Sequence, residues 1–144
     1  MKGQSKEQIA AFFNDTTDTM GNHLLHVCAT YGAYDVMDSL LDIEMLECDP
    51  LTRRDKETPI HCAVKYANER EIELGEAMVK MLTEAGGDPR VKDAHGRKPA
   101  ELCTPRAEAV RTLLREQEYI MNEGLKSTDH EEDEGATGSA SDSD

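Results

Sequence analysis

Two histidine-containing segments hold the residues of this chain that could perform chemistry. Thr58-Pro59-Ile60-His61 is followed directly by Cys62, and His26 lies two positions before Cys28. Histidine can act as a general base or as a metal ligand, and a cysteine thiolate can act as a nucleophile or bind zinc. The first question is therefore whether His61 takes part in a reaction or holds the fold together.

The spacing of these residues argues against a catalytic centre. Zinc sites favour CxxC with a distant HxxxH, and the cysteines at 28, 48, 62 and 103 form no CxxC pair. No GxSxG or GxxxxGK[ST] motif is present. The acidic residues Glu69, Glu71 and Glu73 lie in a polar stretch, where a solvated face explains them more simply than acid–base catalysis. We expect no enzymatic activity, no metal and no cofactor, with a small metal-dependent enzyme as the remote alternative.

Composition favours a single, predominantly helical domain. Only 38% of the 144 residues are hydrophobic, there is no Trp, and two Phe are present. The net charge of −14 disfavours sequence-independent binding to nucleic acid or to an anionic membrane. The N-terminus lacks the apolar core of a secretory signal, and no stretch reaches membrane-spanning length. We expect a monomer in a reducing intracellular compartment, in the cytoplasm, the nucleus or both.

An internal repeat underlies the chain. Aligning residues 21–41 with residues 56–83 places His26 on His61 and Tyr31 on Tyr66. A third copy, residues 96–103, has the sequence GRKPAELC and places a glutamate in the histidine position. Each unit begins with a turn and continues into two helices with apolar residues at helical spacing. The last of these helices begins at Pro105 after Thr104, in the pattern of a helix cap.

These motifs resemble ankyrin repeats. The match rests on TPIHCAV, on the weaker forms NHLLHVCA and RKPAELC, and on the linker AGGDPR, and it covers roughly residues 5–121. The whole chain is also similar to small fungal-type ankyrin-repeat proteins of poorly defined function. The resemblance implies an all-α ankyrin solenoid of about 2.5–3 repeats. The predicted domains are a partial N-terminal repeat helix at 1–15, repeats with a C-terminal capping helix at 16–121, and a disordered acidic tail at 122–144.

Several positions depart from the family pattern. Residues 68–75 form an insertion that either lengthens the second helix of its repeat or bulges from the array. Lys56 stands where glycine is usual, which predicts a distorted hairpin tip. Ser5 to Gln8 fits a capping box that opens a helix resembling the second helix of a repeat. Either the array begins with half a repeat, or the sequence is a truncated or misassigned start.

In ankyrin folds the motif histidine and threonine bond locally and to the neighbouring repeat, so we expect His61 and His26 to be structural. Burying an imidazole without a partner would be unfavourable, and these bonds would satisfy it. The small slot shared by Cys28, Ala63 and Cys103 fits cysteine as a small hydrophobe. The predicted structural motif residues are Leu25, His26, Thr58, Pro59, Ile60, His61, Gly96 and Pro99.

The resemblance also implies that partners bind at the hairpin tips and the exposed side of each first helix. Tyr31 and Tyr66 are predicted to stack on the concave side, either as interface anchors or simply covering repeat junctions. The predicted partner-binding residues are Thr19, Met20, Asn22, Thr30, Tyr31, Arg54, Asp55, Glu57, Lys65, Tyr66, Ala94, His95 and Arg97.

Charge suggests what such a partner could be. Basic residues gather on two hairpins, at 53–56 and 90–98, whereas the tail from Ser127 carries seven acids and no Lys or Arg. The hairpins could bind an acidic segment, including the tail itself, or they could simply be polar tips. The predicted function is a non-catalytic adaptor or scaffold that binds another protein. The alternative is an escort chaperone whose acidic tail shields a basic client such as a ribosomal protein or histone.

Overall fold

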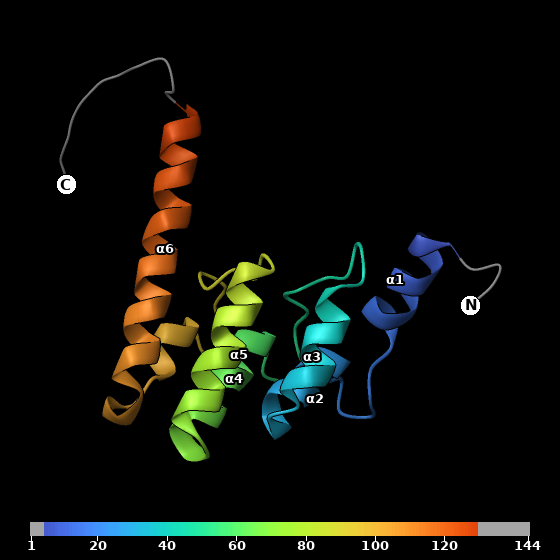
Figure 1. The fold of residues 1–144 in the computed structure, drawn as a ribbon, viewed down its shortest axis with the longest axis horizontal. Helices are drawn as coiled ribbons and strands as arrows, with labels where there is room; N and C mark the ends of the chain where they lie inside the picture. The colour runs from blue at the N-terminus through green and yellow to red at the C-terminus, as the bar shows by residue number, and fades with distance from the viewer. Residues whose placement is uncertain (1–4, 130–144) are drawn as a thin grey trace.

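The computed structural model describes residues 5–129, and Figure 1 shows them as a row of helices. The elements are α1 (Lys6–Asp15), α2 (Leu24–Tyr31), α3 (Tyr34–Leu41), α4 (Pro59–Glu69), α5 (Ile72–Glu84), two 3-10 turns, η1 (Pro99–Leu102) and η2 (Pro105–Ala107), and α6 (Glu108–Asp129). The described residues contain no β-strand, and the predicted all-α class is confirmed.

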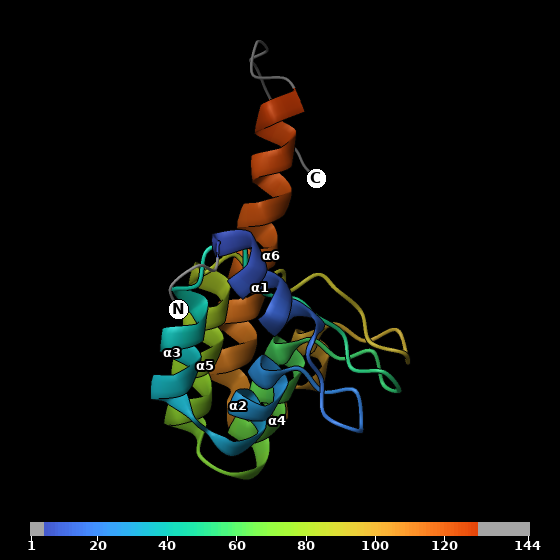
Figure 2. The same ribbon diagram turned by 90° about the vertical axis from the view of Figure 1, so that its right-hand side faces the viewer.

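The helices form antiparallel pairs that stack side by side. α2 pairs with α3 and α4 with α5, while α1 and α6 lie at the two ends of the row (Figure 1). The loops before α2, before α4 and before η1 all project to the same side (Figure 2). The protein is therefore a one-dimensional stack in which each unit contacts its neighbours, and the three loops form one edge.

Local sequence explains where the helices begin and end. Ser5 caps α1, because its Oγ accepts the Gln8 N–H at 3.1 Å while its own N–H donates to the Gln8 side chain at 2.9 Å. α2 ends at Gly32, whose φ of +72° suits glycine. α4 begins with Pro59 at its first position, after Thr58 as the cap. After α5, Gly87 N–H donates to Leu82 O at 2.8 Å and closes the helix end.

The core is continuous along the stack and contains mostly small and aliphatic side chains. Met37, Ile60, Met78, Leu82 and Leu114 are fully buried. They come from α3, α4, α5 and α6, so one apolar interior joins the successive units. Burial of this surface supplies the main favourable term for folding.

The insertion at residues 68–75 lengthens both helices of its repeat and does not bulge outward. α4 has 11 residues and α5 has 13, compared with 8 in each of α2 and α3. Both pairs are joined by two residues, so the extra residues lie within the helices. Gly75 allows the backbones of α4 and α5 to approach closely. A Cβ at this position would lie only 2.5 Å from the Ala67 Cβ.

The third unit differs from its prediction. Its first helix is reduced to the single 3-10 turn η1, since Pro105 disfavours helical geometry at the preceding residue. Thr104 does not cap the next helix through its side chain; instead its hydroxyl donates to Asn68 Oδ1 at 3.1 Å. Regular α-helix then begins at Glu108, after the turn η2.

α6 is the longest element and extends beyond its neighbour α5 (Figures 1 and 2). It continues past residue 121, where the capping helix is predicted to end, and reaches Asp129. The predicted tail therefore starts too early, because Gly124 alone does not stop a helix. The remainder of that tail lies outside the described residues. No helix between residues 5 and 129 combines the length and apolar character needed to span a bilayer.

Candidate partner-binding surface

Three hairpin turns project from the stack, and we call them together the finger edge: residues 18–22, 52–57 and 93–97. Each turn is closed by the same backbone bond, in which the first residue donates its N–H to the carbonyl of the last, at 3.0, 3.0 and 2.9 Å. In the outer two turns an aspartate side chain also accepts two backbone N–H groups. These bonds fix the backbone of each finger.

The middle finger keeps the left-handed residue of its neighbours, with a lysine in place of glycine. Lys56 has a φ of +56°, and Gly21 and Gly96 in the other fingers have φ values of +84° and +75°. Lys56 therefore takes the backbone conformation of the two glycines, whereas the tip itself differs from its neighbours by one extra residue. A side chain in this left-handed conformation is strained, so Lys56 is held by the surrounding turn.

Adjacent fingers are linked to one another. The Ala94 N–H donates to Asp55 O at 2.8 Å, which joins the third finger to the second. The Arg53 guanidinium donates to Thr19 O at 2.8 Å, which joins the second finger to the first. The edge is thus a connected surface and not three independent loops.

The two motif histidines form hydrogen bonds to the backbone of the fingers. Nδ1 of His61 accepts the Thr58 N–H at 3.0 Å, and Nε2 donates to Arg97 O in the next finger at 2.9 Å. His26 repeats the arrangement, with Nδ1 accepting the His23 N–H at 3.0 Å and Nε2 donating to Glu57 O at 2.7 Å. Both rings are therefore fully occupied by bonds that position the finger edge.

The third unit keeps the local half of this pattern. Glu101 replaces the histidine, and its Oε1 accepts the Lys98 N–H at 2.8 Å. A carboxylate can accept this bond but has no N–H to donate toward a further finger.

The environment of these residues is unsuited to chemistry. Burial lowers the pKa of His26 and His61, so both rings are neutral at physiological pH. Burial also raises the pKa of the Cys62 thiol to about 12, which keeps it protonated and unreactive. Within residues 5–129 no three His, Cys, Asp or Glu side chains are grouped to hold a metal ion.

Most of the predicted partner-binding residues lie on the surface. Those that are exposed are Thr19, Met20, Thr30, Tyr31, Arg54, Asp55, Ala94, His95 and Arg97. Asn22 and Lys65 are half-buried. The side chain of Asn22 is used internally, since its amide donates to Asp18 Oδ2 at 3.2 Å.

Glu57 is a correction to the predicted surface. Its side chain is buried, with the residue 6% exposed, and it forms an ion pair with Lys65. Its backbone closes the second finger and receives the bond from His26. Glu57 and Lys65 therefore stabilise the base of the finger and do not present free charges to a partner.

The predicted stacking of the two tyrosines is also wrong. Tyr31 is 72% exposed, whereas Tyr66 is half-buried, and no contact joins their rings. The Tyr66 ring lies against Gly32, since a Cβ there would be 2.6 Å from its hydroxyl oxygen. Arg70 covers the ring from the solvent side, with its guanidinium carbon 5.7 Å from the ring centroid. Of the two tyrosines, Tyr31 is therefore the exposed one.

Some of the basic residues predicted to gather at 53–56 and 90–98 are neutralised within the fold. Arg90 pairs with Asp88 at 2.9 Å, Arg97 with Asp93 at 3.1 Å, and Lys98 with Glu118 at 3.3 Å. Among the basic residues at 53–56 and 90–98, those that form no ion pair within the described residues are Arg53, Arg54, Lys56 and Lys92, all of them exposed. The positive charge available to a partner is thus concentrated on the middle finger and beside the third.

A second set of hydrogen bonds joins the loops that follow the second helix of successive units, which we call the outer loops. The repeat motif does not predict these bonds. Asp49 accepts the Asp88 N–H with both carboxylate oxygens, at 3.1 and 3.0 Å. Asn14 makes the corresponding link one unit earlier, accepting the Glu47 N–H at 2.8 Å. The sequence signal for these bonds was an Asn or Asp a few positions before a finger, as at Asn14 and Asp49. Burial raises the pKa of Asp49 to about 6, although the Asp88 N–H bonds oppose the shift.

Comparison with known proteins agrees with the repeat pattern. The family model of the ankyrin repeat matches residues 55–94. The ankyrin repeat-containing protein YGL242C of Saccharomyces cerevisiae is 39% identical over 97 residues, which are 67% of this chain and 53% of that protein. Zinc finger CCCH domain-containing protein 56 of Arabidopsis thaliana is 33% identical over 106 residues, 70% of this chain and 14% of that protein. The chain thus spans about half of the yeast relative and a small part of the plant one.

Proposed function

This chain belongs to the ankyrin-repeat family, and from that premise we propose that it binds another protein through the finger edge and the exposed side of α2 and α4. The matched repeat and the yeast relative confirm the resemblance predicted from the sequence. Ankyrin repeats are protein-interaction modules, and the family is generally non-catalytic. The finer assignment, an adaptor or scaffold, is our proposal.

One observation carries the proposal: hydrogen bonds join the fingers into a single surface. The Ala94–Asp55 and Arg53–Thr19 bonds join them, and the two histidines hold them from below. A surface whose backbone is already ordered loses little conformational entropy on binding. Loops and finger tips arranged on a rigid scaffold are favourable positions for recognition.

The charge on the edge indicates the chemistry of the partner. Arg54, Lys56 and Lys92 are exposed, with no ion-pair partner among the described residues, on a chain whose net charge is −14. A local positive surface on a negative protein would attract an acidic segment and repel basic ones. We therefore propose an acidic peptide segment of another protein as the ligand.

The test is capture of partners by variants that differ only in where a charge is reversed. We expect Arg54→Glu to weaken retention of a specific partner roughly tenfold, whereas Lys80→Glu, at another exposed basic position, on α5, leaves it unchanged. The purified pair would then be measured by calorimetry at low and high salt. Equal retention by both variants would reject the finger edge as the binding surface.

The escort of a basic client remains a second proposal, supported by the seven acids from Ser127 onward. Deleting residues 130–144 should then abolish recovery of basic proteins while leaving the Arg54-dependent partner bound. Unchanged recovery of basic proteins after the deletion would reject the escort role.

A further inference from the structure

A groove runs between α3 and α5, the second helices of the two complete repeats, and has a volume of about 420 Å³. Figure 2 shows these two helices on the side of the stack away from the finger edge. Apolar surface is contributed by Tyr34 from α3 and by Ala77 and Met81 from α5. Ala77 and Met81 are half-buried and Tyr34 is 38% exposed, so part of this apolar surface is open to a ligand.

The other residues that line the groove are charged, and most of them are acidic. Asp38 comes from α3, and Glu73, Glu76 and Glu84 come from α5. Lys80 is the single basic lining residue, so the groove has a net charge of −3. The charged residues of α5 follow one another at intervals of three or four positions, which places them on one face of the helix.

The fold leaves the acidic side chains of this groove unpaired. None of the four carboxylates forms an ion pair or a side-chain hydrogen bond within residues 5–129. Glu57 and Glu118, by contrast, each pair with a lysine. Like charges on adjacent helices repel one another, and a cationic ligand would relieve this repulsion. The lining of the groove therefore selects a basic occupant.

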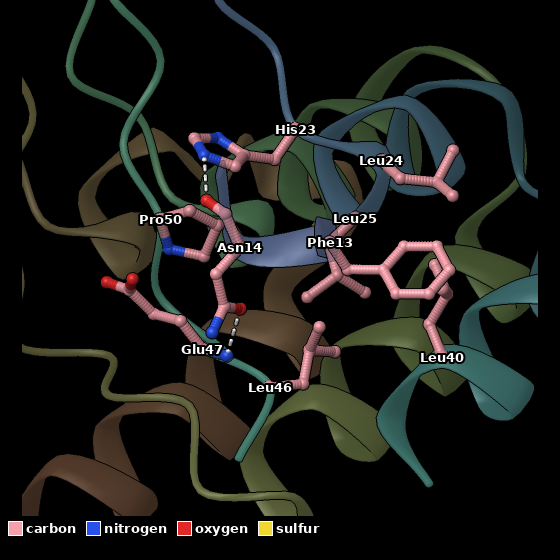
Figure 3. A pocket seen from close by; sticks show the side chains of 9 residues that line it. All are labelled: Phe13, Asn14, His23, Leu24, Leu25, Leu40, Leu46, Glu47 and Pro50. Carbon is pink, nitrogen blue, oxygen red and sulfur yellow. Dashed lines mark hydrogen bonds between the residues drawn. The ribbon is translucent and has the colours of Figure 1, made fainter. Parts of the chain in front are cut away.

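The contact between α1 and the first repeat shows the opposite arrangement. Figure 3 shows Phe13 beside Leu25 and Leu40, and the cavity that these residues help to line has a volume of only about 10 Å³. Asn14 accepts the Glu47 N–H at 2.8 Å beside it, and Glu47 is the single acidic lining residue. Open volume and unpaired charge therefore distinguish the α3–α5 groove from this filled contact.

The sequence of the chain itself matches the groove poorly. Residues 130–144 are acidic and contain no Lys or Arg, and residues 1–4 contain one Lys. A second copy would have to insert its finger edge, where the basic residues of the middle finger are held in a closed turn at 52–57. A basic segment of a different protein is therefore the occupant that the charge favours.

We propose that the α3–α5 groove binds an extended basic segment of a partner protein. Arg or Lys side chains of that segment pair with the four carboxylates, and its aliphatic carbons lie on Tyr34 and Met81. Along α5 the distance from Glu73 to Glu84 is about 16 Å, which about five extended residues span. The site lies apart from the finger edge and from residues 130–144, so its failure would leave both proposals made above standing.

The first test uses a seven-residue peptide, Ser-Arg-Leu-Arg-Ser-Arg-Ser, blocked at both ends and too short to form a helix in water. Binding to the full chain is measured by calorimetry at low salt. The control peptide has citrulline in place of each arginine, which keeps the shape of the side chain and removes its charge. We expect the control to bind at least about tenfold more weakly. Equal binding of the two peptides would overturn the proposal.

Two matched double variants locate the contact. Asp38→Asn with Glu76→Gln removes one carboxylate from each helix and should weaken peptide binding roughly tenfold, without lowering the thermal midpoint of the free chain. Asp15→Asn with Glu116→Gln makes the same chemical changes at exposed positions on α1 and α6 and should leave binding unchanged. An equal loss in both would show that the overall charge attracts the peptide, and would overturn the proposal.

A third variant should strengthen binding, which loss of the fold cannot produce. Lys80→Gln removes the positive charge from the groove and should raise the affinity for the peptide about threefold. The control Thr112→Glu lowers the net charge of the chain by the same amount at an exposed position on α6 and should leave the affinity unchanged. No gain from Lys80→Gln, or an equal gain from both variants, would overturn the proposal.

Amide chemical shifts of the full, unaltered chain show where the peptide lies. We expect the peptide to shift residues 34–38 and 73–84, and to do so equally after deletion of residues 130–144. Shifts confined to the fingers would overturn the proposal, and loss of binding with the deletion would do so by identifying the tail as the site. The same groove shifts on concentrating the free chain would identify a second copy as the occupant and would also overturn it.

Discussion

The two complete repeats differ in the lengths of their helices. The first has two helices of 8 residues, and α2 ends at Gly32 in the left-handed conformation. The second has helices of 11 and 13 residues, and Ala67, the counterpart of Gly32, lies within α4. Both nevertheless keep the histidine hydrogen bonds and a finger with one residue of positive φ at their other end.

The difference shows that the two ends of a repeat are independent. The finger end is fixed by hydrogen bonds that must be satisfied in each unit, whereas the opposite end can extend as long as the helices pack. Tyr66 fills the space that the shorter repeat leaves over Gly32, and Gly75 allows the longer helices to approach. Length can therefore vary at one end without disturbing the binding edge at the other.

The largest expected effect comes from removing a histidine brace. His61→Ala should destabilise the protein by roughly 2–4 kcal/mol, because it leaves the Thr58 N–H and Arg97 O without their partner in a buried setting. His26→Ala is the matched substitution in the short repeat, and it should also destabilise the protein. Thermal unfolding would measure both. A His61→Ala protein as stable as the natural one would contradict the structural role and reopen a catalytic one.

The next effect tests the close contact in the long repeat. Gly75→Ala should destabilise the protein by about 1–3 kcal/mol, since the added Cβ would lie 2.5 Å from the Ala67 Cβ. The control is Gly124→Ala in α6, where an added Cβ meets no atom within 4 Å, and where alanine should stabilise the helix by about 1 kcal/mol. Urea denaturation would measure both changes. Stabilisation by both substitutions would mean that α4 and α5 do not approach as described.

A third effect concerns the outer loops and depends on pH. The folded pKa of Asp49 is raised to about 6 from 3.8, so the native state binds its proton more tightly than the unfolded state between these values. Stability contributed by this group is therefore present at low pH and is lost as pH rises through 6. Asp49→Asn should stabilise the protein at pH 7.5 by about 1–2 kcal/mol, a value reduced for the partial exposure of the carboxylate.

Asp88 provides the opposite case for the same measurement. The Arg90 side chain holds the pKa of Asp88 below its ordinary value, so its contribution is present at neutral pH and is lost as pH falls. Asp88→Asn should therefore destabilise the protein at pH 7.5, whereas Asp49→Asn stabilises it. Denaturation midpoints at pH 5 and pH 7.5 would decide, and a change of the same sign for both variants would contradict this account.

The smallest effect lies in the fingers. Lys56→Gly should stabilise the protein by roughly 0.5–1 kcal/mol, because glycine adopts a φ of +56° without strain. The reciprocal change, Gly96→Lys at a φ of +75°, should destabilise it by a similar amount. Chemical denaturation would measure the pair. If both changes had no effect, the turns would not impose the left-handed conformation.

The sequence predicts the repeats well because their signals are local. The Thr58-Pro59 helix start, the Ser5 capping box and the Gly86-Gly87 stop each depend on residues within a few positions, and all are found in the structure. The insertion was located correctly, but its conformation depends on how Gly75 packs against Ala67, which spacing alone does not reveal.

The binding surface is predicted less well because exposure depends on distant partners. Glu57 lies in a finger, so its sequence position predicts an exposed polar residue. In the structure it is buried, with its carboxylate paired with Lys65 and its carbonyl bonded to His26. The position of Tyr66 depends on Gly32, more than thirty residues away. The exposed apolar groove lined by Phe12, Phe13, Leu24 and Val27 was not predicted either, although Phe12 beside Phe13 in a helix that needs only one apolar face was a usable signal.

The central claim, that partners bind at the finger edge, is tested most directly by photo-crosslinking in cells. A photoreactive amino acid would replace Arg54 on the middle finger or, as the control, Lys80 on α5, both of them exposed. We predict a discrete adduct with another protein from position 54 and none of the same mass from position 80. The same adduct from position 80, with none from position 54, would contradict the assignment of the finger edge as the binding surface.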